Sequence, residues 1–390
     1  AVSAARNGAD VTILERKDRV LKKVLATGNG RCNYTNIYAD TTNYYGKNPE
    51  FTESVLRKFT PNDTIEFFEK LGIIHNIEEK GKVYPLSGQA SSVVDALRLE
   101  AEKSGITIYT DFNVNKVQKT KTGFKIYSDS GNSVISDKII LATGGKSYAE
   151  LGSNGSGFEL AKMLGHSITE LTPALVQLKT EKERITGLHG IKVDTKITAF
   201  HKDKKTGSCD GELLFTDYGI SGPVIFNLSY LTALYNNLIF SVDFMPKYDH
   251  ETLLKMLKER RENLAHLTME NFFNGALNKK LGQLISKRSG VEKLSLPVRN
   301  LSDENIRKLT ELIKNYKIKV LETTGFKNAQ VTAGGILTEE INNETLESKK
   351  VKDIYFAGEV LDIFGDCGGY NLQWAWATGY LAGRSASSKK

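Results

Sequence analysis

Three short apolar segments of this chain run directly into glycine or an acidic residue. They are VTILE at residues 11–15, IILATGG at residues 139–145 and IYFAGE at residues 354–359. In an open α/β sheet, ligands bind at the carboxyl ends of the parallel strands. Glycine at such a strand end lets the backbone approach a bulky ligand closely. The three segments therefore predict an α/β fold with a ligand at one edge of a parallel sheet.

The first fifteen residues match the second half of a dinucleotide-binding βαβ unit. Small side chains predict a helix over residues 1–7, which Gly8 ends, and an apolar strand that ends on Glu15. In such a unit an acidic residue binds ribose hydroxyls and lies about 20 residues beyond a glycine-rich fingerprint. Counting back from Glu15 puts that fingerprint before residue 1. The alternative is an ordinary strand whose terminal carboxylate is solvated.

Residues 112–140 alternate apolar and polar side chains, and turn-forming residues stand at 122–123 and 130–131. Period-two alternation broken by turns is typical of antiparallel strands. We expect a small antiparallel meander between the first strand and IILATGG.

The length of the chain sets the number of domains. Its 390 residues exceed the roughly 250–300 that a single hydrophobic core can hold, so two domains are expected. Since no apolar stretch reaches the roughly 18 residues of a membrane-spanning helix, we expect no membrane partner.

Cysteine and histidine are sparse. The three cysteines, Cys32, Cys209 and Cys367, form no CxxC motif, and the six histidines have no metal-ligand spacing. Sparse and unpaired cysteine is typical of a reducing compartment, so a cytoplasmic location is expected. The sequence predicts no metal site.

Several longer blocks carry a family resemblance. They include GRCNYTN at residues 30–36, GSNGSGFELAKMLGH at residues 152–166 and GGYNLQWAWATG at residues 368–379. With these blocks the chain resembles, over nearly its whole length, the YhiN/BaiN-like family of NAD(P)- and FAD-dependent oxidoreductases. These flavoproteins are related to aminoacetone oxidase and, distantly, to the fumarate reductase flavoproteins. The resemblance implies a Rossmann-like FAD-binding domain of the glutathione-reductase type with an inserted domain.

The resemblance implies FAD as cofactor and assigns a set of residues to it. Glu15 is expected to bind the adenosine ribose, and the backbone near Val114 the adenine. The amino-terminal turn of the last helix is expected to face the N1–C2=O edge of the flavin, where its free N–H groups and the helix dipole favour negative charge. The full expected set is Glu15, Arg16, Lys23, Gly30, Arg31, Cys32, Asn33, Val114, Thr143, Gly144, Gly145, Gly358, Glu359, Gly369, Tyr370, Asn371 and Leu372.

No catalytic acid or base is assigned by the sequence. Three candidates for a catalytic role are Arg31, Tyr148 and Tyr370. Arg31 suits a pyrophosphate or a substrate carboxylate, because its planar guanidinium binds both. The alternative is that Arg31 ties its own loop together through backbone carbonyls. The glycine-rich loop at residues 152–157 leads into a helix expected at residues 158–165. The alternative to a ligand role for this loop is that Ser156 simply caps that helix.

The chain departs from the family pattern in two places. The amino-terminal GxGxxG is absent, and Asp217 stands in FTDYG where the family usually has His. Because the pyrophosphate needs the N–H groups of that glycine loop, we expect this chain to hold no well-ordered FAD. Asp217 has no imidazole, so a role that depends on that ring is not expected in this chain.

The middle of the chain is expected to interrupt the FAD-binding domain. That domain is assigned to residues 1–178 and 326–390, and the insertion to residues 179–325, with a β part at about 179–245 and a helical part at about 246–325. The insertion holds 24 Lys and Arg against 18 Asp and Glu, most of the net charge of +7. We interpret this excess as a solvated surface, and do not expect a nucleic-acid partner.

The sequence thus indicates an FAD-dependent oxidoreductase, and the resemblance favours an NAD(P)H-linked reductase of an activated C=C bond in a small organic substrate. NAD(P)H would be a transient electron donor, since no second nucleotide fingerprint is present. The first alternative is a flavin-dependent amine oxidase of aminoacetone type. The second is a flavin- or nucleic-acid-binding protein without turnover. The oligomeric state is not indicated.

Overall fold

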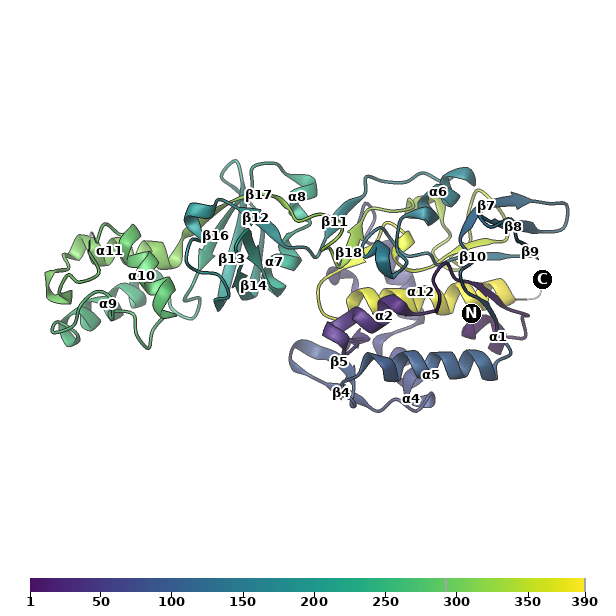
Figure 1. Cartoon of the computed structure of the whole chain (residues 1–390), viewed down its shortest axis with the longest axis horizontal. Coiled ribbons are helices and arrows are strands. Elements are labelled where there is room, and N and C mark those ends of the chain that lie inside the picture. Colours follow the sequence, from purple (N-terminus) through teal and green to yellow (C-terminus); the bar gives the residue numbers. More distant parts are fainter. Residues whose placement is uncertain (292, 389–390) are drawn as a thin grey trace. The chain divides into compact units, whose positions relative to one another are not determined.

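The computed structural model describes residues 1–291 and 293–388. It consists of two compact units, drawn in Figure 1. The first unit combines Ala1–Ala174 with Phe326–Lys390, and the second is Leu175–Gly325. The second unit thus occupies the segment that the sequence assigns to an insertion.

Two pairs of parallel strands form the α/β part of the first unit. Strand β1 (Thr12–Leu14) pairs with β6 (Thr107–Tyr109), and β10 (Ile139–Leu141) pairs with β19 (Ile354–Phe356). The second pair joins residues from either side of the second unit, because Ile139 lies opposite Ile354. The expected parallel pairing and the return of the chain to β10 after the insertion are confirmed, but β1 is not hydrogen-bonded into the same sheet, so the three strand ends belong to two separate parallel pairs.

Helix α12 (Tyr370–Ser387) is the central helix of the first unit. Its side chains Trp374, Ala377 and Leu381 are buried in one core with the strand β19. It packs closely on α1 (Val2–Arg6), since a Cβ on Gly383 would lie 3.0 Å from the Cβ of Ser3. The other α-helices of the unit are α2 (Lys22–Ala26), α3 (Phe51–Lys58), α4 (Pro61–Lys70), α5 (Ala90–Lys103) and α6 (Ser156–Met163).

The predicted meander is confirmed as the antiparallel sheet β7 (Val114–Lys119), β8 (Phe124–Ser128) and β9 (Ser133–Ser136). Phe124, Ile126 and Ser128 are buried on one face of β8, as period-two alternation requires. The remaining strands of the unit form small antiparallel ladders: β2 (Thr35–Asn36) and β4 (His75–Ile77) with β5 (Lys82–Pro85), β3 (Tyr44–Tyr45) with β20 (Phe364–Gly365), and β11 (Thr172–Ala174) with β18 (Val331–Ala333).

The second unit is built on a closed barrel with the strand order β12-β15-β14-β13-β16-β17. Closure leaves no unpaired sheet edge. Its strands are β12 (Leu178–Thr180), β13 (Lys192–His201), β14 (Lys204–Phe215), β15 (Gly219–Ser221), β16 (Ile239–Asp243) and β17 (Tyr316–Thr323).

The helices of the second unit pack against the barrel around one hydrophobic core. Helix α7 follows Gly222 with Pro223 in its first turn, where a missing N–H costs nothing. The helices are α7 (Pro223–Leu228), α8 (Leu231–Leu234), α9 (His250–Asn263), α10 (Lys279–Arg288) and α11 (Asp303–Lys314).

One part of the insertion differs from the sequence expectation. The helical part was placed at 246–325, but residues 316–323 are strand β17 of the barrel. Tyr316, Ile318 and Val320 are buried there, and the residues between them are exposed. This alternation is typical of a strand. It was overlooked because residues 316–323 directly follow the amphipathic helix α11 and the two segments were assigned together as helical.

Candidate functional site

The carboxyl end of β10 opens abruptly from the core. Leu141 is buried, whereas the next two residues, Ala142 and Thr143, are exposed. Gly144 then takes a left-handed φ of 71°, which turns the backbone at low cost only in glycine. The end of β10 therefore presents only backbone and small side chains. A flat ligand can approach such a surface closely.

Glu359 ties this strand end to two other elements. Its Oε1 accepts a hydrogen bond of 2.8 Å from the N–H of Thr332, and its Oε2 lies 2.7 Å from Nζ of Lys23. Gly145 packs directly on the side chains of Thr332 and Glu359, since a Cβ there would lie 2.5 Å from Thr332 Oγ1 and 2.6 Å from Glu359 Oε1. The structure thus brings together three of the predicted residues.

Thr332 was missed by the sequence interpretation. Its Oγ1 accepts the N–H of Lys146 at 2.7 Å and lies 3.2 Å from the hydroxyl of Ser147. The hydroxyl therefore fixes the turn after the glycines of β10. The available signal was its place in the glycine-containing segment VTAGGI, residues 331–336.

The glycine-rich loop at 152–157 leads into α6. Gly155 is the N-cap with φ 85°, and the side chain of Asn154 accepts the N–H of Ser156 at 3.1 Å. The alternative prediction that Ser156 caps the helix is wrong, because Ser156 is already the first helical residue. Gly157 is required by packing, since a Cβ there would overlap the side chain of Thr143.

Glu15 and Arg16 lie beside the same loop. Oε1 of Glu15 accepts the N–H of Lys17 at 2.8 Å and lies 4.0 Å from the position of a Cβ on Gly152. Arg16 donates from Nη1 to the carbonyl of Gly152 at 3.2 Å. Its Nε is buried and has no partner among the described residues. A buried unpaired donor is costly, so Arg16 retains capacity for an anionic or carbonyl acceptor.

The amino terminus of α12 is positioned by Gly369 and by the side-chain amide of Asn371. Gly369 is the N-cap with φ 99°, and a Cβ there would overlap the carbonyl oxygen of Thr35 and lie 2.9 Å from Asn33 Oδ1. The side chain of Asn371 accepts the N–H of Gly365 and donates to its carbonyl, both at 2.8 Å. The first-turn N–H groups of a helix have no intrahelical partner, and they carry the positive end of its dipole.

Arg31 is paired with a carboxylate of the chain itself. It lies in a loop where Gly28, Asn29, Gly30 and Cys32 all have left-handed φ. Its guanidinium hydrogen-bonds both carboxylate oxygens of Glu78, at 2.5 and 3.3 Å, and lies 4.1 Å above the Tyr84 ring. The tie to backbone carbonyls is therefore wrong: the partner is a carboxylate. This pairing raises the pKa of Arg31 and lowers that of Glu78.

The remaining predicted residues are placed as follows. Tyr370 opens α12 half-buried, and burial raises the pKa of its phenol to about 12, with the charge of Asp366 adding to the effect. Tyr148 is exposed and has a left-handed φ of 60°, which is rare for an aromatic residue. Cys32 is fully buried, and burial raises the pKa of its thiol to about 11, so it is a packed residue. Val114 begins β7.

Asp217, at the position where the family usually has His, lies in the second unit. Its Oδ1 is 3.1 Å from Nδ1 of His189, and both side chains are exposed. Within residues 1–291 and 293–388, no group of three side chains is arranged to hold a metal ion, and no helix is long and apolar enough to cross a bilayer.

The whole chain matches a known family. The family model described as "HI0933-like protein Rossmann domain" matches residues 1–385. The chain belongs to the HI0933-like family. The resemblance inferred from its sequence blocks and the Rossmann-like α/β fold are confirmed, and the chain is a flavin-dependent oxidoreductase.

Three curated relatives span nearly the whole chain. A "3-dehydro-bile acid delta(4,6)-reductase" of Clostridium scindens is 40% identical over 100% of this chain and 96% of its own. A "Ribosomal RNA dihydrouridine synthase" of Escherichia coli is 31% identical over 99% of this chain and 94% of its own. The protein of the same name from Haemophilus influenzae is 29% identical over 99% and 95%.

Solved structures are similar at lower identity. The open conformation of a flavocytochrome c3 fumarate reductase is 15% identical, with a TM-score of 0.45 over 99% of this chain and 75% of that one. The 3-ketosteroid-delta4-(5alpha)-dehydrogenase of Rhodococcus jostii RHA1 is 14% identical, with a TM-score of 0.44 over 100% and 94%.

The described residues fit FAD. Arg16 has a buried donor without a partner, the carboxyl end of β10 is exposed backbone, and α12 presents first-turn N–H groups behind a glycine cap. Glu15, at the end of β1, offers carboxylate acceptors for hydroxyl groups. These features come from elements distant in sequence, yet all lie in the first unit.

Proposed function

We propose that the protein reduces a carbon–carbon double bond conjugated to a carbonyl in a small, steroid-like substrate, with NAD(P)H as the electron donor. The observation that carries the proposal is the glycine-capped amino terminus of α12. Its position is set by Gly369, and the two hydrogen bonds between the side chain of Asn371 and the backbone of Gly365 hold the first turn in place.

The chain's own residues have separable roles in this proposal. FAD, when bound, supplies the two-electron chemistry. The N–H groups of Tyr370, Asn371 and Leu372 favour negative charge at the flavin edge, an effect of roughly 0.3–1 kcal/mol when exposed and up to about 2 when partly buried. Glu15 would hold the ribose hydroxyls, and Arg16 would donate to the cofactor from its unpaired Nε.

The substrate class is supported by the relatives. The Clostridium scindens relative is named as a reductase of a 3-dehydro bile acid, in which the 4,6 double bonds are conjugated to the 3-carbonyl. The uracil C5=C6 bond, which is saturated in dihydrouridine, is also conjugated to a carbonyl. Both names thus describe reduction of an electron-poor C=C bond, which favours this chemistry over amine oxidation.

A flavin reduction assay tests the proposal. Full-length holoprotein is mixed anaerobically with NADH or NADPH, and the loss of flavin absorbance is followed by stopped flow. A steroid 4-en-3-one is then added, and the return of absorbance and the saturated product are measured. We expect reduction by a nicotinamide and reoxidation by the enone. Reoxidation only by oxygen, after reduction by aminoacetone, would establish the amine oxidase instead.

A second candidate substrate is a uracil base in RNA. The observation that favours it is a band of lysines around an aromatic ring on the outer face of the barrel, together with the two relatives named for ribosomal RNA. The same assay distinguishes it, because unmodified ribosomal RNA replaces the enone as oxidant and dihydrouridine is scored by mass spectrometry.

A further inference from the structure

The outer face of the barrel is defined by alternation along β13. Thr195, Ile197 and Ala199 are buried, whereas Lys196 and the residues at 198 and 200 are exposed or half-exposed. Because successive side chains of a strand point to opposite faces, the second set lies outside the barrel. The neighbouring strands β14, β16 and β17 continue this face on either side.

Strand register aligns one row of side chains across the four strands. Ile239 of β16 lies opposite Lys319 of β17 on one side and Phe200 of β13 on the other, and Phe200 lies opposite Lys205 of β14. The row therefore has an aromatic and an aliphatic side chain between two lysines. Ile239 is 37% exposed, which is unusual for a large apolar side chain on a sheet.

The next row is polar. Ser241 lies opposite Lys317 on one side and Thr198 on the other, and Thr198 lies opposite Ser208. The hydroxyls of Thr198 and Ser208 are 3.2 Å apart, which shows that both point to the same face. This row offers Lys317 and the hydroxyls of Thr198 and Ser208 as hydrogen-bonding groups, whereas Ser241 is buried and donates to Asn315 Oδ1.

The charge of this face is positive. The carboxylate of Asp243 is neutralised by Lys314 at 2.6 Å, and Lys196 has Asp210 opposite it. The lysines of the two rows are Lys205, Lys317 and Lys319. Among the described residues, none of them has a carboxylate within 4 Å.

A cavity of about 230 Å³ opens on the same face. Phe200, Thr198 and Ser241 line it from the strands, and His250 and Lys314 line it from the ends of α9 and α11. Sites for drug-sized ligands measure roughly 300–1,000 Å³, so this cavity suits one base or ribose better than a whole cofactor.

We propose that this face, the two rows with their cavity, binds single-stranded RNA. The lysines track the phosphates, Phe200 stacks on an unpaired base, and the hydroxyls meet ribose groups. Stacking on Phe200 requires a base that can leave its own stack. Bases in single-stranded RNA can do so, whereas bases in duplex RNA cannot. This proposal deepens the second candidate function and rests on it.

Fluorescence anisotropy of a labelled, uridine-rich single-stranded RNA oligomer tests the surface on the full-length holoprotein. In the double variant Lys317→Ala/Lys319→Ala, we expect the slope of log affinity against log salt to fall by about 1.4, since each lost phosphate contact on a single strand removes about 0.7. For Phe200→Leu, we expect affinity roughly 5- to 150-fold weaker at fixed salt with the slope unchanged.

The matched control is Lys255→Ala, an exposed lysine on α9 whose nearest carboxylate, Glu259, lies 4.0 Å away. It should alter neither affinity nor slope. The proposal is overturned if the face variants bind as the parent does, or if duplex RNA and heparin compete as well as the single strand, which would show polyanion binding only. Circular dichroism checks that each variant is folded.

The same variants separate this proposal from the reductase. Flavin reduction by nicotinamide and turnover of the steroid enone should be unchanged in them. A holoprotein that reduces the enone but binds no single-stranded RNA overturns the surface and leaves the main proposed function standing. A holoprotein that binds RNA through these residues, but reduces no enone, supports the surface and overturns the steroid reductase.

Discussion

Nζ of Lys23 lies 2.7 Å from Oε2 of Glu359, a residue 336 positions further along the chain. The other carboxylate oxygen accepts the N–H of Thr332 at 2.8 Å. One side chain thus connects α2, the middle of β18 and the turn that follows β19. Both partners of the ion pair are largely shielded from water, which makes their interaction stronger than that of an exposed pair.

Replacing the carboxylate of Glu359 should loosen this junction. In Glu359→Gln the amide oxygen can still accept from Thr332, but the charge that holds Lys23 is lost. We expect a loss of stability of about 1.5–3 kcal/mol, the usual contribution of a hydrogen bond to a charged group. Thermal unfolding of the holoprotein measures it. Glu150→Gln, in an exposed turn, is the control, and an equal effect there would contradict the assignment.

Two glycines of α12 form a matched pair for testing its amino terminus. Gly369→Ala forces a Cβ into the carbonyl of Thr35 at a left-handed φ, so we expect displacement of the first turn and much weaker FAD retention. Gly379→Ala, in open space within the same helix, should be stabilising by up to about 1 kcal/mol. Dialysis followed by flavin absorbance gives the readout. Equal retention in both variants would mean that this turn does not hold the cofactor.

Glu15 is expected to bind the adenosine ribose. Glu15→Ala should weaken FAD binding by about 1.5–3 kcal/mol, the contribution of one set of charged hydrogen bonds. Glu15→Asp should be intermediate, because a shorter side chain no longer reaches both hydroxyls. Isothermal titration with FAD measures both. Since Oε1 also accepts the N–H of Lys17, unfolding of the apoprotein must be measured too, and a change there alone would indicate a structural role.

Local patterns made much of this fold predictable. The three strand ends and the meander were correctly identified because their periodicity and glycines are contiguous in sequence. The contacts of Arg31 were not, since Glu78 is 47 residues away and only the antiparallel ladder of β2 and β5 brings the two segments together. Thr332 was missed although it lies in VTAGGI, because its role depends on three partners that are distant in sequence.

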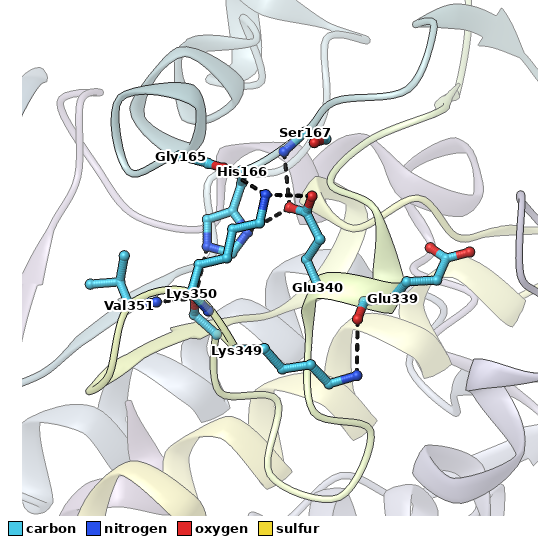
Figure 2. A network of polar contacts seen from close by, with 9 residues as sticks. Gly165, His166, Ser167, Glu339, Glu340, Lys349, Lys350 and Val351 are labelled. Carbon is cyan, nitrogen blue, oxygen red and sulfur yellow. Dashed lines mark hydrogen bonds and ion pairs between the residues drawn. The ribbon is translucent and has the colours of Figure 1, made fainter.

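A buried polar network in the first unit, drawn in Figure 2, was also not predicted. His166 is fully buried, with Nδ1 3.1 Å from Glu340 Oε2 and Nε2 2.8 Å from the hydroxyl of Ser348. Glu340 also binds Lys350 at 2.6 Å and accepts the N–H of Ser167 at 2.9 Å. The network joins the end of α6 to the turn before β19.

The pKa values of this network predict how stability depends on pH. Burial lowers the pKa of His166 below its usual 6.5, against the opposing charge of Glu340. Burial of the Glu340 carboxyl acts to raise its pKa, but the hydrogen bonds from Lys350 and Ser167 outweigh it and lower the value to about 2. Both groups therefore bind protons more readily in the unfolded chain than in the folded one.

The sign is the same for both groups, but the pH windows differ. The contribution of His166 is fully present above pH 6.5 and is lost as pH falls towards its lower folded pKa, because the unfolded chain binds the proton first. That of Glu340 is present above pH 4.5 and is lost as pH falls to about 2. We expect His166→Gln to flatten the first decline and leave the second. Chemical unfolding across this range measures both, and a parent-like slope below pH 6.5 in His166→Gln would assign that decline to other groups.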